Sequence, residues 1–342
     1  MAWPRNDESR NNEAMNVSIT MTVLVAAYVA ASVGYVYRWR GRVRYRSFSQ
    51  YLRKSWPIFA PANCLLYLAT RSSARQTMLD AGYVQGISII RENWKLIRDE
   101  ALALHRAGEL DATAQPGSVG YHDVGFRTFY KRGWRKFYLT WYGEPHRSAL
   151  RLCPETVRLL GQAPGIRAAM FSVLPAGSEL TLHSDPMACS LRYHLGLQTP
   201  DSDRCFISVD GCRRAWRNGE DFVFDETYPH YAKNETGELR LILMCDVDRP
   251  MSFMGHAFNR LYSLVPKAMR VPNTREDRRG PISWLFAVVA PVRSSAVALK
   301  QQHRKLYLSL KYSLNTCLVL LAFLLVYVML DSVERVGTAA LF

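Results

Sequence analysis

Two uncharged apolar runs, one near each end of the chain, most constrain what it can fold into. Residues 17–37 contain no charged side chain, and residues 312–330 form a second run of the same kind. Each run is close to the roughly 20 residues that an α-helix needs to cross the hydrocarbon of a bilayer. We therefore predict two transmembrane helices, with residues 38–311 of the 342-residue chain between them.

Each run has an alternative interpretation. The first could be a secretory signal peptide, but acidic as well as basic residues precede it, and arginines follow it where a small-residue cleavage site would be expected. The second could be a buried core helix, although its length and its position near the C-terminus favour a membrane span.

Basic residues flank both runs on their inner sides. Seven Lys and Arg lie between Arg38 and Lys54 with no acid before Asp80, and four more lie between Lys300 and Lys311. Because Lys and Arg stay on the cytoplasmic side of a membrane, we expect residues 38–311 in the cytoplasm and both termini outside.

The charge and the cysteines narrow the class of partner and the compartment. A formal net charge of +15 predicts an anionic partner. The basic clusters lie beside the predicted spans, which favours anionic lipid headgroups and argues against nucleic acid. Seven cysteines without a CxxC pair favour a reduced, cytosol-facing region. Nothing in the sequence indicates an oligomeric state.

The middle of the chain has the pattern of an all-β domain preceded by a helix. Apolar residues recur at three- and four-residue steps over residues 87–107, which predicts a helix. After Trp134, short β-branched and aromatic runs alternate with Gly, Pro, Asn and Asp clusters. The strands predicted in this way are residues 137–141, 169–174, 191–197, 205–209, 222–224 and 239–245. Many short strands without long helices between them predict a sandwich or a closed double-sheet barrel.

Two shorter apolar segments flank this domain. Residues 56–69 contain two prolines and are too short to span a bilayer, and residues 280–292 are of similar length. Residues 56–69 are expected to lie in the membrane interface or to re-enter the membrane, and residues 280–292 to rest on the membrane surface. Simple anchoring and lining of a path for a lipid chain are the two roles open to them.

Four residues have the order and spacing of an oxygenase site. His183 and Asp185 are two apart, His230 follows 45 residues later, and Arg240 lies ten residues beyond that. Two histidines and a carboxylate can occupy one face of an octahedral Fe(II) ion, although zinc accepts the same donors. A buried arginine such as Arg240 needs an anionic partner, either the carboxylate of a chelating oxo-acid or an internal acid such as Asp225.

Strand periodicity supports this site, since residues two apart on a strand share a face. Arg192 and His194 are related in this way. Arg240 shares its face with Ile242 and Met244, and the leucines at 239, 241 and 243 take the other face.

The stretch from about Trp134 to Pro250 resembles the aspartyl/asparaginyl β-hydroxylase domain family of 2-oxoglutarate dioxygenases. The matching positions are residues 137–139, 153–156, 171–175, 191–197 and 224–225, with Gly177, Trp216, Gly219, Glu220, His230, Arg240 and Asp246. The resemblance implies a mainly β, double-stranded β-helix (jelly-roll, cupin-like) catalytic domain with flanking helices, acting with Fe(II), 2-oxoglutarate and O₂.

The resemblance also implies residue roles. His183 and His230 resemble the family's iron-binding histidines, and Arg240 resembles the arginine that binds the far carboxylate of 2-oxoglutarate. Four further residues resemble co-substrate contacts, and these are Arg192, His194, Ser172 and Leu174. The vertebrate protein-modifying members have no acidic ligand after the first histidine, whereas this chain has Asp185. We therefore predict a complete His183, Asp185 and His230 triad.

A β-hydroxylase domain held between two spans resembles the bacterial lipid A hydroxylases. This resemblance implies hydroxylation at C2 of a secondary acyl chain of lipid A in the inner membrane, with a cytoplasmic catalytic domain and periplasmic termini. Hydroxylation of ornithine lipid or of protein Asp/Asn side chains is an alternative. An inactive, membrane-anchored binding or scaffold protein is an alternative of another class.

The expected organisation follows from these segments. It comprises an outer tail (1–16), a transmembrane helix (17–37), a basic juxtamembrane, interfacial and helical region (38–117), the dioxygenase domain (118–255), a basic interfacial region (256–311), a second transmembrane helix (312–330) and an outer tail (331–342).

Overall fold

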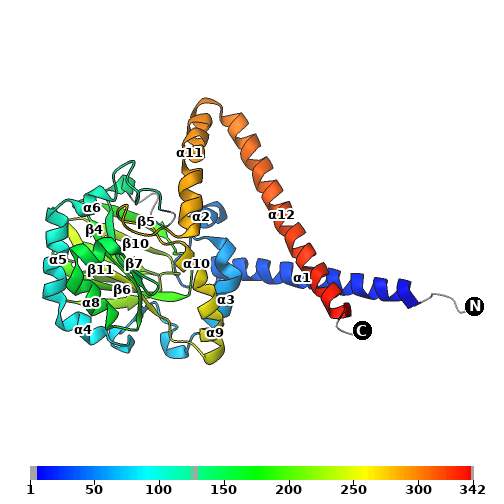
Figure 1. Ribbon diagram of the computed structural model, residues 1–342, viewed down its shortest axis with the longest axis horizontal. Coiled ribbons are helices and arrows are strands. Elements are labelled where there is room, and N and C mark those ends of the chain that lie inside the picture. The colour runs from blue at the N-terminus through cyan, green and yellow to red at the C-terminus, as the bar shows by residue number, and fades with distance from the viewer. Residues whose placement is uncertain (1–5, 124, 126–129, 340–342) are drawn as a thin grey trace, which may run out of the picture. The chain divides into compact units, whose positions relative to one another are not determined.

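The computed structural model describes residues 6–123, 125 and 130–339 (Figure 1). It divides the chain into two compact units. One unit comprises residues 1–31 and 289–342, and the other runs from Ser32 to Val288. The second unit extends beyond the predicted dioxygenase domain of residues 118–255 at both ends.

The Ser32–Val288 unit is built on two antiparallel sheets. The seven-stranded sheet has the order β1-β9-β6-β11-β4-β2-β3, and the four-stranded sheet has the order β5-β10-β7-β8. The strands are β1 (Met78–Leu79), β2 (Arg135–Trp141), β3 (Glu144–Pro145), β4 (Ile166–Leu174), β5 (Glu179–His183), β6 (Ser190–Gln198), β7 (Cys205–Val209), β8 (Cys212–Ala215), β9 (Asp221–Phe224), β10 (His230–Asn234) and β11 (Arg240–Asp248).

From β4 onward the chain repeatedly crosses between the two sheets. Strands β4, β6, β9 and β11 belong to the larger sheet, and β5, β7, β8 and β10 belong to the smaller one. This alternation winds two antiparallel sheets face to face, which is the architecture of a jelly roll, or double-stranded β-helix. The predicted double-sheet fold is confirmed. Strands β5, β8 and β10 were not among the predicted strands.

The alternation of side chains along each strand builds two cores. On β4, Met170 and Leu174 face the space between the sheets, whereas Phe171 and Val173 face the opposite side. The inner core includes Trp216 and Phe224, and the outer core packs the larger sheet against helices. The predicted alternation of β11 is confirmed in the same way.

Helices cover this unit on two sides (Figure 1). They are α2 (Phe48–Lys54), α3 (Ala60–Ala69), α4 (Ile87–Glu92), α5 (Trp94–Arg106), α6 (Glu109–Ala112), α7 (Arg147–Leu152), α8 (Pro154–Gly161), α9 (Phe253–Tyr262) and α10 (Leu264–Ala268). Helices α4, α5 and α8 lie on one side of the sheets, and α3, α9 and α10 lie on the other. The continuous helix predicted over residues 87–107 is wrong in one respect, because it is interrupted at Asn93.

Three long helices complete the chain: α1 (Asn6–Arg38), α11 (Pro281–Gln302) and α12 (Arg304–Ala339). Among the described residues, one helical stretch is long and apolar enough to cross a membrane, Asn16–Arg38, which contains the predicted span at 17–37. The predicted span at 312–330 lies within α12, where many side chains fall outside the described residues. The second span therefore stays a prediction.

Candidate metal centre and its two cavities

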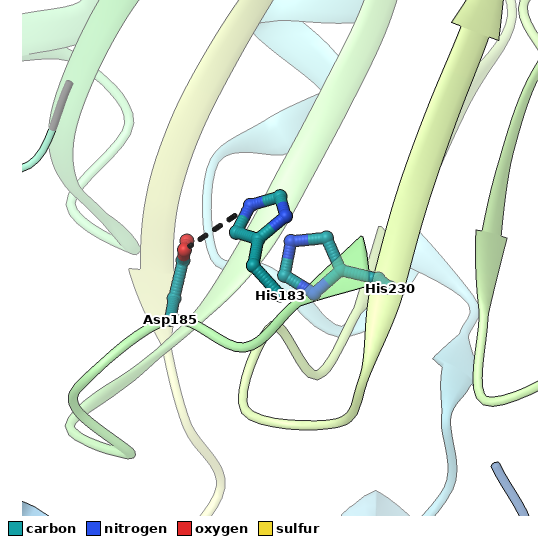
Figure 2. A group of neighbouring side chains, drawn as sticks. All are labelled: His183, Asp185 and His230. Atoms are coloured by element: carbon teal, nitrogen blue, oxygen red, sulfur yellow. Dashed lines mark ion pairs between the residues drawn. The ribbon is translucent and has the colours of Figure 1, made fainter. Parts of the chain in front are cut away.

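The two candidate histidines face each other across a pair of strands. His183 is the last residue of β5, His230 is the first residue of β10, and they are direct partners in the antiparallel register. Opposed residues of an antiparallel pair hold their side chains close together. The ring centroids are accordingly 4.3 Å apart (Figure 2).

Asp185 completes the cluster from the loop that follows β5. Its Oδ1 lies 3.8 Å from Nε2 of His183. One potential ligand atom from each of His183, Asp185 and His230 lies within 4.8 Å of the other two. The backbone N–H of Asp185 donates to the carbonyl of Glu226 at 2.9 Å, which fixes the loop beside β10. The structure thus brings together the three residues predicted to bind iron.

Backbone carbonyls orient both imidazole rings. Nδ1 of His183 lies 2.7 Å from the carbonyl of Thr181, and Nδ1 of His230 lies 2.9 Å from that of Tyr228. A carbonyl only accepts, so each Nδ1 carries the proton and each Nε2 keeps a lone pair for a metal. Burial lowers the pKa of both histidines to about 4, so both rings are neutral at physiological pH.

A small cavity of about 50 Å³ lies on one side of the triad, between the two sheets. It is lined by the triad and by Arg192, His194, Ser172 and Arg240, together with Trp134, Leu180, Ile207, Trp216, Phe224, Ala232 and Met244. Leu174 does not line it, although its side chain belongs to the same core between the sheets. Every other residue predicted for the site therefore borders this cavity.

Arg240 has no acidic partner among the described residues. Its Nη2 donates to Oγ of Ser172 at 3.1 Å, its guanidinium lies 4.5 Å from the ring centroid of Trp216, and its buried Nε has no partner. Burial lowers its pKa to about 10. The internal ion pair with Asp225 that the sequence left open is not formed.

Asp225 instead pairs with two other arginines. Arg40 and Arg249 each approach its Oδ2 to 2.9 Å, and both are buried. Arg40 also lies between the rings of Tyr67 and Tyr228, at 3.6 and 3.9 Å from their centroids. One arginine of the basic cluster that follows the first apolar run is therefore a structural residue and is not exposed to headgroups.

His194 presents a second polar atom without a partner. Trp216 Nε1 donates to His194 Nδ1 at 3.2 Å. Because an indole N–H only donates, Nδ1 must accept, and the neutral ring carries its proton on Nε2. Burial and the neighbouring Arg240 hold the pKa of His194 well below its usual range. Its Nε2 is buried without a hydrogen-bond partner.

Arg192 has a different environment from the other cavity residues. Its guanidinium pairs with Asp185 at 2.9 Å, with Glu226 at 2.9 Å and with Asp246 at 3.3 Å. Burial raises the pKa of Glu226 to about 8, and the neighbouring Asp246 and Asp185 carboxylates add to this effect against the attraction of Arg192. Sequence reasoning missed Glu226 in this role and gave no role to Asp246 beyond its match to the family.

A much larger cavity of about 380 Å³ opens on the other side of the triad. It shares His183, Asp185 and Arg192 with the small cavity. Its remaining wall includes the apolar residues Trp56, Phe59, Trp141, Met170, Met187, Val265, Pro266, Met269 and Ile282. It also includes the charged residues Arg53, Lys54, Asp123, Glu226 and Asp246. The candidate metal site therefore lies between a small cavity of about 50 Å³ and a much larger one of about 380 Å³.

Two residues in the wall of the large cavity have a backbone conformation that is unusual for side-chain-bearing residues. Trp56 has φ 53° and Tyr142 has φ 46°, in the left-handed region. Such positions cost about 1–3 kcal/mol each and gather at functional sites, where the surrounding structure holds them. Tyr142 is held by a hydrogen bond from its hydroxyl to Asp246 at 3.3 Å.

Comparison with known proteins shows which family this domain resembles. Residues 91–250 match the model of the aspartyl/asparaginyl β-hydroxylase family. This part of the chain is therefore similar to that family. The matched range contains every strand from β2 to β11, including those that carry the two histidines.

Two relatives illustrate the range of the family. The chain is 31% identical over 152 residues to an ornithine lipid ester-linked acyl 2-hydroxylase of Rhizobium tropici, covering 44% of this chain and 53% of that protein. It is 30% identical over 179 residues to the aspartyl/asparaginyl β-hydroxylase of Homo sapiens, covering 51% of this chain and 22% of that protein. The chain thus spans about half the length of the first and about a fifth of the second.

Among solved structures, a prolyl-4-hydroxylase of Pseudomonas putida aligns with a TM-score of 0.33 at 16% identity, covering 54% of this chain and 99% of that one. A score this low adds nothing to the strand order described above.

Proposed function

We propose that this protein is a membrane-bound, Fe(II)- and 2-oxoglutarate-dependent dioxygenase that hydroxylates C2 of an acyl chain of a membrane lipid. The observation that carries the proposal is the position of the triad between a small chamber containing an unpaired arginine and a large apolar chamber. Similarity to a hydroxylase family supports the reaction type.

The donor set fits iron. His183 and His230 would bind it through Nε2, since carbonyls hold each Nδ1–H, and Asp185 would bind it through a carboxylate oxygen. Two histidines and one carboxylate are the facial triad of Fe(II) oxygenases and leave positions open for a co-substrate. Iron held there would supply the activation of O₂ that an unreactive C–H bond requires.

The unpaired atoms of the small cavity fit a dicarboxylate. Arg240 offers a buried guanidinium whose Nε has no partner, and His194 offers an Nε2–H donor. A buried positive charge without a counter-ion is costly, and a carboxylate would relieve that cost with charge-assisted hydrogen bonds. Ser172 joins Arg240 from the neighbouring strand. These contacts would hold 2-oxoglutarate with its keto-acid end toward the triad.

The large cavity fits a hydrocarbon chain. Its apolar wall would exclude water and hold an extended acyl chain by burial of its methylene groups, each of which contributes roughly 0.8 kcal/mol. His183 and Asp185 form part of the wall of this cavity, so a chain held in it would present one carbon to the triad. An Asp or Asn side chain of a protein substrate would gain little from such a wall.

For the lipid headgroup we propose lipid A, hydroxylated on a secondary acyl chain at the cytoplasmic face of a bacterial inner membrane. Both termini would be periplasmic. The resemblance to lipid A hydroxylases and the apolar Asn16–Arg38 helix support this assignment. Ornithine lipid is the second candidate, because the Rhizobium tropici relative is named for that substrate.

Mass spectrometry of total lipids from cells with and without the gene tests both candidates. Loss of one oxygen from lipid A on deletion is the expected result, and loss confined to ornithine lipids would move the substrate. Succinate formation by the purified protein, abolished in His183→Ala, tests the chemistry. An unchanged lipid profile and no succinate would contradict the proposal and favour an inactive scaffold.

A further inference from the structure

An exposed apolar face lies on the Ser32–Val288 unit, separate from the candidate site. It is formed by α3 with the turn before it, α9, α10 and the start of α11, and we call it the apolar face. Its most exposed large side chains are Ile58 (80% exposed), Leu68 (74%), Phe253 (85%), Met254 (74%), Leu261 (67%), Leu264 (57%), Trp284 (60%) and Leu285 (58%). An exposed apolar cluster of this kind marks an interaction surface.

Helix α9 shows that this exposure does not come from loose packing. Its inward face is packed, since Gly255 is buried and Phe258 and Tyr262 contact the core cluster around Leu66 and Met251. A Cβ added at Gly255 would lie 2.6 Å from Cβ of Ala69, so α9 lies directly against α3. The outward positions Phe253, Met254 and Leu261 therefore belong to a fixed surface.

Backbone hydrogen bonds join the elements of the face. Ser252 N–H donates to the carbonyl of Ala69 at 2.8 Å, just before α9 begins. Gly280 N–H donates to the carbonyl of Arg270 at 2.9 Å, which ties the start of α11 to the end of α10. The apolar helical stretches Pro57–Ala69 and Pro281–Ala290 are too short to cross a bilayer.

The charges around the face have one sign. No Asp or Glu occurs in residues 38–79 or 249–275. Within these two ranges every exposed charged side chain is basic, including Arg53, Arg71, Arg260 and Lys267. Glu276, between α10 and α11, is exposed and pairs with Arg151. By contrast, α5 on the opposite side exposes Asp99 beside Lys95. An apolar surface with a basic border and no acid complements an anionic lipid surface.

The large cavity reaches the surface at this face. Of its described lining residues, Arg53, Gly125 and Ile282 are exposed. Arg53 lies in α2 and Ile282 in the first turn of α11, and both Val265 and Pro266 of α10 form part of the wall. A bilayer against the apolar face would therefore meet the opening of the cavity.

We infer that the apolar face rests on an anionic phospholipid bilayer, with the outward side of α9 buried among the acyl chains. The face is a second membrane contact besides the apolar stretch of α1, and it holds the opening of the large cavity at the lipid surface. The entry of acyl chains into the cavity at this opening rests on the proposed function. The docking of the apolar face on the bilayer is independent of the proposed function and can be measured without turnover.

Photocrosslinking of the full-length chain tests the inference. The protein is reconstituted in phosphatidylethanolamine–phosphatidylglycerol vesicles with p-benzoylphenylalanine at position 253, 254 or 261, and lipid adducts are quantified by mass spectrometry after irradiation. The same residue at Ala103, an exposed position of α5, is the control. We expect at least fivefold more lipid adduct at the α9 positions than at position 103.

A charge variant gives a second, matched comparison. The double substitution Phe253→Glu/Met254→Glu should reduce the adduct at position 261 at least threefold, because carboxylates resist burial among acyl chains. Ala103→Glu/Ala107→Glu adds the same charge at an exposed position of α5 and at the exposed residue that follows the helix, and it should leave that adduct unchanged.

Three outcomes would overturn the inference. The first is equal lipid adduct at positions 253, 254, 261 and 103. The second is crosslinking of the α9 positions to another copy of the chain in place of lipid. The third is equal yield in vesicles of phosphatidylcholine alone, which would refute the choice of an anionic surface. Lipid adducts in a protein that forms no succinate would support docking while the proposed function failed.

Discussion

Arg240→Met should have opposite effects on the stability of the free protein and on co-substrate binding. The wild-type guanidinium is buried and has no acidic partner among the described residues. Burial lowers its pKa from 12.5 to about 10, so keeping it charged inside the fold costs about 3 kcal/mol. A methionine of similar length would remove that cost and lose one hydrogen bond to Ser172, which contributes about 1 kcal/mol.

The free Arg240→Met protein should therefore be more stable than the wild type by about 2 kcal/mol. For a folded unit of this size, that corresponds to an increase of roughly 4–8 °C in melting temperature. Binding of 2-oxoglutarate should weaken instead, because removing one partner of a buried charge pair costs 2–5 kcal/mol. A loss of about 3 kcal/mol is roughly a hundredfold increase in Kd.

Arg249→Met is the matched control. Arg249 is as buried as Arg240, but it pairs with Asp225 at 2.9 Å and donates to the carbonyl of Ser190 at 3.0 Å. Its removal should lower the melting temperature, because breaking a buried ion pair destabilises the fold by about 3 kcal/mol. Any effect of Arg249→Met on 2-oxoglutarate binding should be small, since it does not line the small cavity.

The assay compares melting temperatures in detergent and measures 2-oxoglutarate binding by calorimetry with Mn(II) in place of iron. A lower melting temperature for Arg240→Met without co-substrate would refute the argument, because it would mean that the arginine already has a stabilising partner. Unchanged 2-oxoglutarate binding would refute the assignment of the small cavity.

Three further predictions concern residues around the site. His146→Gln should remove part of the acid sensitivity of folding, because burial lowers the pKa of His146 to about 4. The contribution of His146 to the free energy of unfolding is present above pH 6.5 and falls by about 2 kcal/mol between pH 7 and pH 5. The difference between the unfolding free energies of the two proteins at each pH measures it. Met170→Trp should narrow the large cavity and lower kcat/KM for a long-chain lipid at least tenfold with an unchanged KM for 2-oxoglutarate. Met170→Leu should behave like the wild type. Arg192→Lys should weaken Mn(II) binding about tenfold in calorimetry, because the compact charge of a lysine does not replace a guanidinium that pairs with Asp185, Glu226 and Asp246. The affinity for 2-oxoglutarate at saturating Mn(II) should change less than twofold. The reverse pattern for Arg192→Lys would show that it binds the co-substrate directly.

The strands that sequence reasoning found are those whose side chains fill the outer core, the inner core or both. β4, β6, β7 and β11 are nearly continuous runs of buried residues, and such apolar runs can be recognised as strands in the sequence. β5 and β10 are different, because they border the cavities and carry polar and ligating side chains where core residues would otherwise stand. The strands that hold the two histidines were therefore the hardest to recognise as strands.

The candidate ligands were nevertheless predictable. The order and spacing of an HxD pair, a later histidine and an arginine can be recognised in the sequence, without knowing which strands pair. The partners of these residues were not predictable in this way. Glu226 lies after β9 and Asp246 within β11, and only the folded sheets bring both to Arg192.

The partners of Arg192 explain how a loop residue such as Asp185 can serve as a metal ligand. Both histidines are fixed by strand register and by carbonyls, whereas Asp185 lies beyond the end of β5. Arg192 holds its Oδ2 at 2.9 Å, while Oδ1 lies toward Nε2 of His183. The remaining side of Arg192 is occupied by Glu226 and Asp246, so the acids position the arginine and the arginine positions the ligand. Because its guanidinium is engaged in this way, the proposed dicarboxylate would be bound by Arg240 and His194, whose unpaired atoms lie in the same small cavity.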